Sequence, residues 1–342
     1  MKTFRCECGN RLFWGSTCCV SCRLETGFCP LCQDIVALNG STGNGFTCSK
    51  CKQALRKCRH YLEDEACNWC IAVDDESDRT NLCGSCQLTT VIPDISLPDD
   101  RTKWIRLEAA KRRVLYSLYF LKLPIGTKDN EWHPKLTFEF KADSEQPVST
   151  GHAQGAITIN IKEADSAIRE QTRQEFGEPH RTLVGHFRHE LGHYYWEVLI
   201  KGQREEEFQR LFGDPNLSYA DAKKTYYNSP PPSDWSQHFI SAYATMHPWE
   251  DFAETFGAYL DLVAILDTVA SLKWAEVDWT DFEKLIRQYK SIGVSVNEFN
   301  REMGLKDLVP EVFSRPVEEK LKYVHNLLAS GEATDVPATG TD

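Results

Sequence analysis

Apolar residues recur at helical spacing through most of the chain after residue 100. The stretch from Arg101 to Leu123 combines this spacing with good helix formers and predicts a long amphipathic helix. Residues 181–200 also fit one helix, on which a stripe of apolar side chains is expected to be buried. That stripe comprises Leu183, Phe187, Leu191 and Val198. From Asp165 onward nearly every periodic stretch is helical, and prolines separate the helices.

Two stretches between these helices alternate apolar and polar residues, as strands do. They are LTFEFKA at 136–142 and GAITINI at 155–161, and both are rich in Ile, Phe and Thr. A small sheet packed with helices, followed by a mostly helical C-terminal half, places the chain in the α+β class. The small and polar end of the chain, residues 331–342, is predicted to be a disordered tail.

Composition and charge narrow the class of protein. Hydrophobic residues make up 41% and charged residues 26% of the 342 positions, which is typical of a soluble globular protein with two or three domains. No apolar run reaches membrane-spanning length, and Cys6 stands where a signal peptide needs an apolar core. We therefore expect a cytoplasmic protein that does not engage membranes. The net charge of −11 disfavours nucleic acid as its main partner.

The 14 cysteines all lie between Cys6 and Cys86, mostly in C-x-C or C-x-x-C pairs. A C-x-x-C knuckle directs two thiolates at one ion, and two knuckles joined by a hairpin complete a tetrahedral site of four sulfur atoms. Without an export signal, this spacing favours zinc over disulfides. We predict a region of rubredoxin-like zinc ribbons at 1–92. The seam VIPDISLPDD at 91–100 joins it to a second domain at 93–330.

Three such sites would use twelve of the fourteen cysteines. The predicted ligands are Cys6, Cys8, Cys19 and Cys22 in the first site, Cys29, Cys32, Cys48 and Cys51 in the second, and Cys58, Cys67, Cys83 and Cys86 in the third. Cys19 is preferred to Cys18 because it forms C-x-x-C with Cys22, whereas Cys70 or His60 remains an alternative ligand in the third site. Closed sites have no open position for a substrate, so their role is expected to be structural.

A basic stretch runs from Lys50 to His60 between the knuckles. It offers an alternative role for the ribbons, the recruitment of an acidic partner or nucleic acid. The favoured interpretation is solvated charge that offsets the thiolate-rich sites.

The helix predicted at 181–200 contains the pattern H-E-x-x-H. His189 and His193 are four residues apart and share one face of a helix, so both can bind one ion. Glu190 lies one step further round and can face a metal-bound water. His186 precedes His189 by three residues, but no glutamate is placed to serve a 186/189 pair. We interpret His186 as a histidine beside the site or an ordinary helix residue.

A catalytic zinc site needs a third protein ligand and one open position. Residues 246–260 predict a well-packed helix that begins at Pro248, and Glu250 and Glu254 share one of its faces. One of the two acids can bind zinc while the other holds a ligand histidine by its free N–H group. Asp251 is expected to face solvent.

The motif HELGH followed by Glu250 and Glu254 resembles the gluzincin metallopeptidases. In that group the first acid of the second helix is the ligand and the acid four residues later supports a ligand histidine. The resemblance implies these roles for Glu250 and Glu254. The lethal-factor type of gluzincin also has a tyrosine seven residues before the ligand glutamate, and Tyr243 stands there in this chain. The implied role of Tyr243 is a hydrogen bond to the developing oxyanion, with Tyr194 and Tyr195 as alternatives.

Motifs along the whole chain are similar to a bacterial family of zinc-binding metallopeptidases with an N-terminal zinc ribbon. These motifs include CECG, VIPD, EAAKRR, ITINI, GHFRHELGHYYW, HPWEDFAET and EFNREMGLKDL, and they extend from Cys6 to about Leu328. The resemblance implies a cytoplasmic bacterial protein with a mostly helical, zincin-like domain. It also implies one catalytic zinc ion, about three structural zinc ions and a peptide or protein substrate. The CPLC and CSKC knuckles and Cys70 depart from the simplest pattern of that family.

The expected activity is zinc-dependent hydrolysis of peptide bonds. Zinc lowers the pKa of its bound water to about 7, and Glu190 takes a proton from that water and passes it to the leaving nitrogen. Residues 155–161 are expected to be the edge strand along which the peptide lies. The alternative is a non-catalytic zinc-ribbon scaffold, or a nucleic-acid-associated protein with a latent zincin domain. The presence of Glu190 argues against a scaffold, and the ribbons offer a surface for a protein partner.

Overall fold

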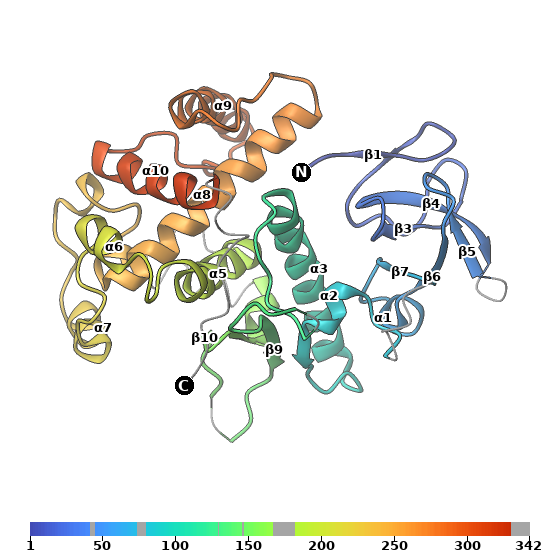
Figure 1. Cartoon of the computed structure of the whole chain (residues 1–342), viewed down its shortest axis with the longest axis horizontal. Helices are drawn as coiled ribbons and strands as arrows, with labels where there is room; N and C mark the ends of the chain where they lie inside the picture. Colours follow the sequence, from blue (N-terminus) through green and yellow to red (C-terminus); the bar gives the residue numbers. More distant parts are fainter. Residues whose placement is uncertain (42–44, 74–79, 129, 146, 167–181, 330–342) are drawn as a thin grey trace.

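The computed structural model of the chain has an N-terminal region of short strands and a larger region of long helices around a small sheet (Figure 1). The structure describes residues 1–342 except 42–44, 74–79, 129, 146, 167–181 and 330–342. The tail predicted at 331–342 therefore lies outside the described residues. The arrangement is α+β, which confirms the fold class predicted from the sequence.

The N-terminal region is built from antiparallel strands. β1 (Phe4–Arg5) pairs with β2 (Arg11–Leu12), and five further strands form a sheet in chain order. These are β3 (Thr26–Cys29), β4 (Asp34–Ser41), β5 (Gly45–Cys48), β6 (Ala54–Lys57) and β7 (Cys70–Ala72). Two single-turn helices, α1 (Arg59–Leu62) and α2 (Gly84–Gln87), each begin directly after a cysteine.

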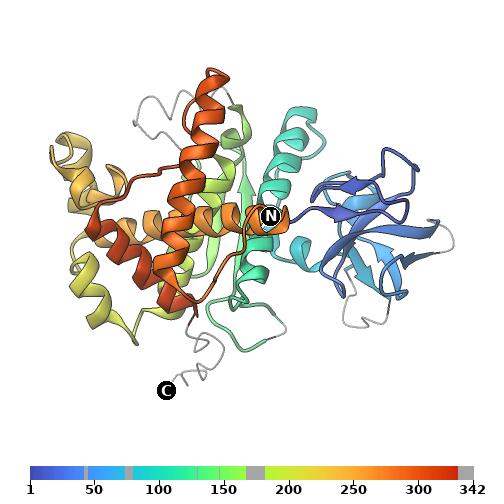
Figure 2. The same ribbon diagram turned by 90° about the horizontal axis from the view of Figure 1, so that it is seen from above.

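Aromatic side chains attach this region to the long helix α3 (Pro98–Phe120). The ring centroid of Trp14 lies 5.2 Å from that of Phe28, 5.9 Å from that of Trp69 and 5.0 Å from that of Tyr116 on α3. All four side chains are buried, and such edge-on pairs add to the free energy of burial. The N-terminal region therefore docks on α3, as Figure 2 shows from above.

The basic stretch from Lys50 to His60 differs from the prediction of solvated charge. Lys57 is buried, with its Nζ 2.6 Å from Glu25 and 4.3 Å from the ring centroid of Tyr61. His60 is buried edge-on against Trp104. The prediction is wrong for these two residues because a region with so little core also packs the apolar parts of long polar side chains.

The second region contains a four-stranded sheet in the order β10-β11-β9-β8. Its strands are β8 (Thr89–Val91), β9 (Thr137–Lys141), β10 (Gly151–Ala153) and β11 (Ala156–Asn160). β9 and β11 match the two predicted strands, but β11 is not the edge that was expected, because β10 pairs with it on the outside. Gln154 and Gly155 both have positive φ, as a two-residue hairpin turn requires, and this turn folds β10 back.

Three long helices pack together beside this sheet. They are α3, α5 (Leu183–Leu199) and α8 (Pro248–Ser271). Phe138 and Phe140 alternate onto the buried face of β9 and contact Phe187 of α5. Of the apolar stripe predicted for α5, Leu183 is only partly buried because it lies in the first turn, and the other three residues are buried.

The crossing of α5 and α8 positions the site. A Cβ atom on Gly192 would lie 2.6 Å from the Cα of Ala253, so only glycine permits this close approach of the two helices. Arg188 on α5 forms an ion pair with Asp261 on α8 and links the helices on one side of that approach. The glycine of HELGH is therefore explained by helix packing rather than by chemistry.

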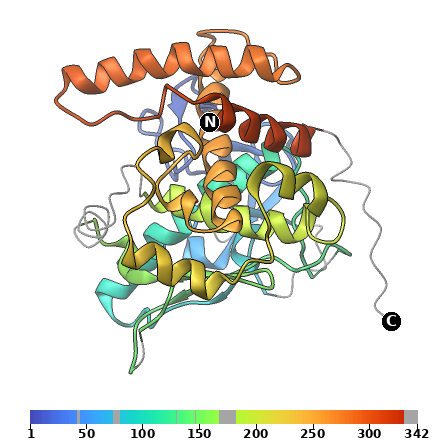
Figure 3. The ribbon, with the colours of Figure 1, turned by 90° about the vertical axis from the view of Figure 1, so that its left-hand side faces the viewer.

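The remaining helices surround α8. They are α6 (Glu205–Phe212), α7 (Tyr219–Asn228), α9 (Phe282–Glu302) and α10 (Arg315–Ala329), and Figure 3 shows α9 and α10 above the long axis of α8. Asp251 is fully buried with its Oδ2 2.6 Å from Nζ of Lys320 on α10, so its predicted exposure is wrong. Helix α10 packs over the face of α8 that carries Asp251, and the sequence alone does not predict this packing. No helix in the described ranges is long and apolar enough to cross a membrane.

Candidate metal centres

The two histidines of H-E-x-x-H lie on consecutive turns of α5. Thr182 caps this helix, because its side chain accepts a hydrogen bond from the N–H of Gly185 at 2.9 Å. The helix then turns His189 and His193 to the same side, with ring centroids 4.8 Å apart. Their Nε2 atoms are 3.1 Å apart. The local sequence therefore suffices to bring two of the predicted ligands together.

Helix α8 supplies the third donor across the crossing. Pro248 begins the helix, and Nδ1 of His247 caps it by accepting from the N–H of Trp249 at 3.1 Å. The Oε2 atom of Glu250 then lies 3.0 Å from His189 Nε2 and 3.4 Å from His193 Nε2. Ligands about 2.05 Å from a tetrahedral zinc ion are about 3.3 Å apart, so the three donors fit zinc.

Glu254 holds the far side of one ligand ring. Its Oε1 lies 2.6 Å from Nδ1 of His189, which fixes a proton on Nδ1 and leaves Nε2 free to face an ion. The structure thus places Glu250 at the centre and Glu254 behind the histidine, the order that the resemblance implied. His193 is held differently, because its ring packs against Trp249 with centroids 3.9 Å apart.

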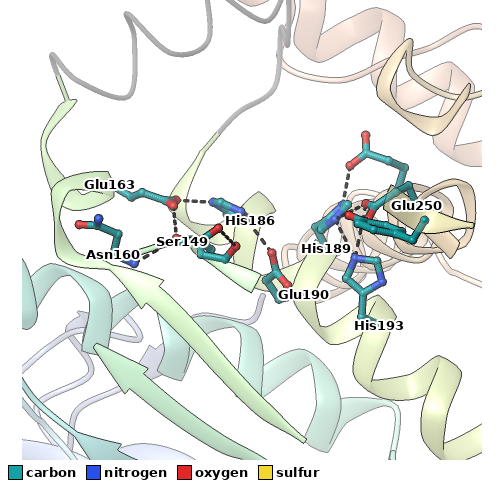
Figure 4. A network of polar contacts seen from close by, with 11 residues as sticks. Ser149, Asn160, Glu163, His186, His189, Glu190, His193 and Glu250 are labelled. Atoms are coloured by element: carbon teal, nitrogen blue, oxygen red, sulfur yellow. Dashed lines mark hydrogen bonds and ion pairs between the residues drawn. The ribbon is translucent and has the colours of Figure 1, made fainter. Parts of the chain in front are cut away.

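Glu190 points away from the three donors and contacts His186 (Figure 4). Its Oε1 lies 3.4 Å from Nε2 of His186, and the other ring nitrogen of His186 bonds to Glu163 on the 3₁₀ helix η1 (Ile161–Ala164). Within the described residues, Oε2 of Glu190 is buried and makes no hydrogen bond. A buried carboxylate oxygen without a donor is costly, so this atom is suited to accept a proton from water.

The electrostatics of the site favour ionised carboxylates. Burial would raise the pKa of Glu250, but the charge of His193 and hydrogen bonds with both histidines hold it well below its usual range. Burial would also raise the pKa of Glu190, but the hydrogen bond from His186 and the neighbouring histidines lower it. For His186, burial lowers the pKa, but Glu163 and Glu190 outweigh burial and raise it to about 10.

Tyrosines stand on two sides of the centre. Tyr243, on the 3₁₀ helix η3 (Tyr243–Thr245), has its ring centroid 6.0 Å from that of His189. Tyr219, which sequence reasoning missed, donates a hydrogen bond to Oε1 of Glu250 at 2.8 Å. Tyr194 and Tyr195 are fully buried, and their hydroxyl groups donate to the carbonyls of Pro134 and Pro124. These two residues support the fold and do not face the donors.

Two contacts at the metal centre could not be predicted from the sequence. Glu163 is 23 residues from His186, and Tyr219 is 31 residues from Glu250. Neither pair has a characteristic spacing, because each depends on how distant elements pack. His186 does have a local signal, since its spacing of four residues from Glu190 puts both on one helix face.

The cysteines gather into three groups of four, and the members of each group bring their Sγ atoms within 4.8 Å of one another. The groups are Cys6, Cys8, Cys19 and Cys22; Cys29, Cys32, Cys48 and Cys51; and Cys58, Cys67, Cys83 and Cys86. Pairs of Sγ atoms are 3.5 to 3.9 Å apart, far longer than the roughly 2.05 Å of a disulfide. Four sulfurs about 2.3 Å from a tetrahedral zinc ion are about 3.8 Å apart, so each group fits zinc.

The two remaining cysteines stand outside these groups. The thiol of Cys18 is exposed and donates to the carbonyl of Arg23 at 3.5 Å. Cys70 is buried on β7 and is not a member of any of the three groups. His60, the other alternative ligand, is likewise not part of the third group.

Comparisons with known proteins agree with this division of the chain. A family model described as "Putative zinc-binding metallo-peptidase" matches residues 100–327, and a zinc-ribbon domain matches residues 3–97. The uncharacterized proteins Rv2568c of Mycobacterium tuberculosis and Mb2598c of Mycobacterium bovis are each 36% identical over 340 residues, which cover 96% of this chain and 95% of the relative. No solved structure gives a significant match. The first family match covers most of the chain and includes His189, His193 and Glu250, so the chain belongs to the family described as "Putative zinc-binding metallo-peptidase" and carries an N-terminal zinc-ribbon domain.

Proposed function

We propose that the chain is a zinc-dependent peptidase with one catalytic zinc ion, held by His189, His193 and Glu250, and three structural zinc ions in the ribbons. One observation carries the proposal: three donor atoms have the mutual spacing of zinc ligands, and the residue next to the ligand His189 is a glutamate with a buried, unpaired carboxylate oxygen. Three protein ligands leave a fourth position open, as hydrolytic zinc sites require.

Zinc bound there supplies a Lewis acid and lowers the pKa of a water ligand to about 7. Side chains of the protein would carry out the proton transfers and position the reacting groups. The Oε2 atom of Glu190 would accept a proton from the water as the water oxygen bonds to the peptide carbonyl carbon, and Glu190 would then donate that proton to the nitrogen as the C–N bond breaks. His186 and Glu163 hold the Glu190 carboxylate in place from its other oxygen. Tyr243 donates to the carbonyl oxygen as it gains negative charge.

The extended substrate would lie along β10 rather than along β11. β10 is the outer strand of the sheet within the described residues, so its outer main-chain groups are available to pair with a peptide. His152 on β10 stacks near His193, with ring centroids 6.5 Å apart, so this edge runs close to the metal ligands. A peptide added there would pass the open position of the zinc.

The test is cleavage of a proteome-derived peptide library by the zinc-loaded full chain and by Glu190→Gln. The variant keeps the shape of the side chain but cannot take a proton, so its rate should fall about 10²- to 10⁴-fold while its zinc content is unchanged. Glu250→Ala serves as the second comparison and should lose one zinc ion per chain and all cleavage.

Cuts made by the wild type alone would support the proposal, and their flanking residues would define specificity. Equal cleavage by wild type and Glu190→Gln would remove Glu190 from the role of general base. No cleavage by a wild type with four zinc ions would overturn the proposal and favour a non-catalytic scaffold built on the same metal centres.

A further inference from the structure

Helix α7 belongs to a segment that is poorly anchored by apolar contacts. From Asp214 to Tyr243 every residue is described, and none is buried. Gly213, with φ 101°, separates this segment from α6, and prolines 230–232 follow α7. Because apolar burial is the main source of stability, a segment without buried residues should undock from the rest of the protein at low free-energy cost.

Two polar contacts of this segment lie at the metal centre. The hydroxyl of Tyr219, at the start of α7, donates to Oε1 of Glu250 at 2.8 Å. The ring of Tyr219 also packs 5.4 Å from His247 and 6.0 Å from Trp249 between centroids. Nε2 of His247 lies 3.1 Å from the carbonyl of Leu217 and donates to it, because Nδ1 is already the acceptor at the N-cap of α8.

The two oxygens of Glu250 therefore have different tasks. Oε2 faces the two histidines, and Oε1 accepts from Tyr219. The side chain is 1% exposed, so water cannot easily replace that donor.

We infer that Tyr219 is a positioning residue for the metal ligand Glu250, and that zinc binding at this centre is coupled to the docking of α7. The hydrogen bond fixes the rotation of the carboxylate so that Oε2 faces the ion. By linkage, whatever factor the docked segment adds to zinc affinity, zinc adds equally to the stability of docking. The inference rests on the zinc site of the proposed function but not on peptide cleavage.

The first test is the zinc affinity of the full-length Tyr219→Phe variant, measured by competition with a chelator. The affinity to be measured is that of the zinc ion that is absent from Glu250→Ala, which identifies the ion at the α5–α8 crossing. Loss of a hydrogen bond to a metal ligand typically lowers affinity 10- to 100-fold, and that is the expected result. Tyr323→Phe is the matched control, since it removes a buried hydroxyl on α10 that has no partner among the described residues.

The second test is hydrogen exchange of the α7 amides in the wild type, with this zinc ion present and removed. Zinc should slow exchange of α7 in the wild type, and it should slow that exchange less in Tyr219→Phe. Equal zinc affinity in Tyr219→Phe and Tyr323→Phe would overturn the positioning role. Zinc-independent exchange of α7 in the wild type would overturn the coupling.

These readouts separate the inference from the proposed function. Neither measures turnover, so a chain that cleaves no peptide can still show both effects. If Glu250→Ala retained every zinc ion, Glu250 would not be a zinc ligand, and the inference would fail.

Discussion

The ribbon clusters and the centre at the α5–α8 crossing offer metal ions opposite kinds of site. Each ribbon cluster has four sulfur donors from knuckles close in sequence, and the third cluster is fully buried. The other centre has three donors from two helices, and the ligands His193 and Glu250 are 57 residues apart. The first arrangement closes the coordination shell, whereas the second leaves a position open.

The surroundings of the two kinds of site differ as well. Some ribbon cysteines stand at strand ends, as Cys29 and Cys48 do, or directly before a helix, as Cys58 and Cys83 do. At the helix crossing, the donors depend on neighbours: Glu254 orients His189, and Tyr219 holds Glu250. Metal in the ribbons would add to a small core, whereas at the helix crossing a large core positions a few polar atoms. Three substitutions test this difference.

The largest expected effect is in the ribbons. Cys67→Ala removes one ligand of the buried third cluster and should cost one zinc ion per chain and most of the stability of the N-terminal region. Structural zinc supplies roughly 10 to 16 kcal/mol of apparent binding free energy in small domains, so the loss should be visible in thermal unfolding.

The matched control for that variant is Cys70→Ala, which changes a cysteine of equal burial three residues away. It should keep all its zinc and lose only about 1 kcal/mol through the small cavity. If Cys70→Ala lost zinc and Cys67→Ala did not, the ligands of the third cluster would have to be reassigned.

The next largest effect is expected at Tyr243. Tyr243→Phe removes the donor that we propose for the reacting oxygen and should lower kcat about 10²-fold or more, which is about 3 kcal/mol, with little change in KM. Zinc content and kcat should be measured together, beside Tyr323→Phe. An unchanged kcat would leave Tyr243 as packing, and a loss of zinc would show that it supports the metal ligands instead.

The smallest effect is expected at Glu254. Glu254→Ala frees Nδ1 of His189 and should weaken zinc binding 10- to 100-fold without abolishing it, whereas Glu250→Ala should abolish it. Glu254→Gln keeps an oxygen acceptor and should recover much of the affinity. Chelator competition on the three variants measures their zinc affinities. If Glu254→Ala lost zinc binding and Glu250→Ala kept it, the roles of Glu250 and Glu254 would be reversed.

Local pattern predicted a large part of the architecture. Helix α5 and the strands β9 and β11 fall within the stretches that periodicity indicated, whereas α3 begins before its predicted stretch at Pro98 and α8 runs beyond residue 260 to Ser271. The errors concern position in the assembled fold. β10 was missed because it is short and lacks alternation, and Asp251 was placed in solvent because α10, which covers it, begins 64 residues later.

The sequence by itself determined the first two cysteine groups and the pair His189 and His193. Knuckles and residues four apart on a helix meet through local geometry, whatever the rest of the chain does. Only the tertiary structure decided that Glu250 completes the centre, that Glu254 supports it, and that Glu163 and Tyr219 reach it. These contacts join elements far apart in the chain, and the close helix crossing at Gly192 and the packing around it fix their distances.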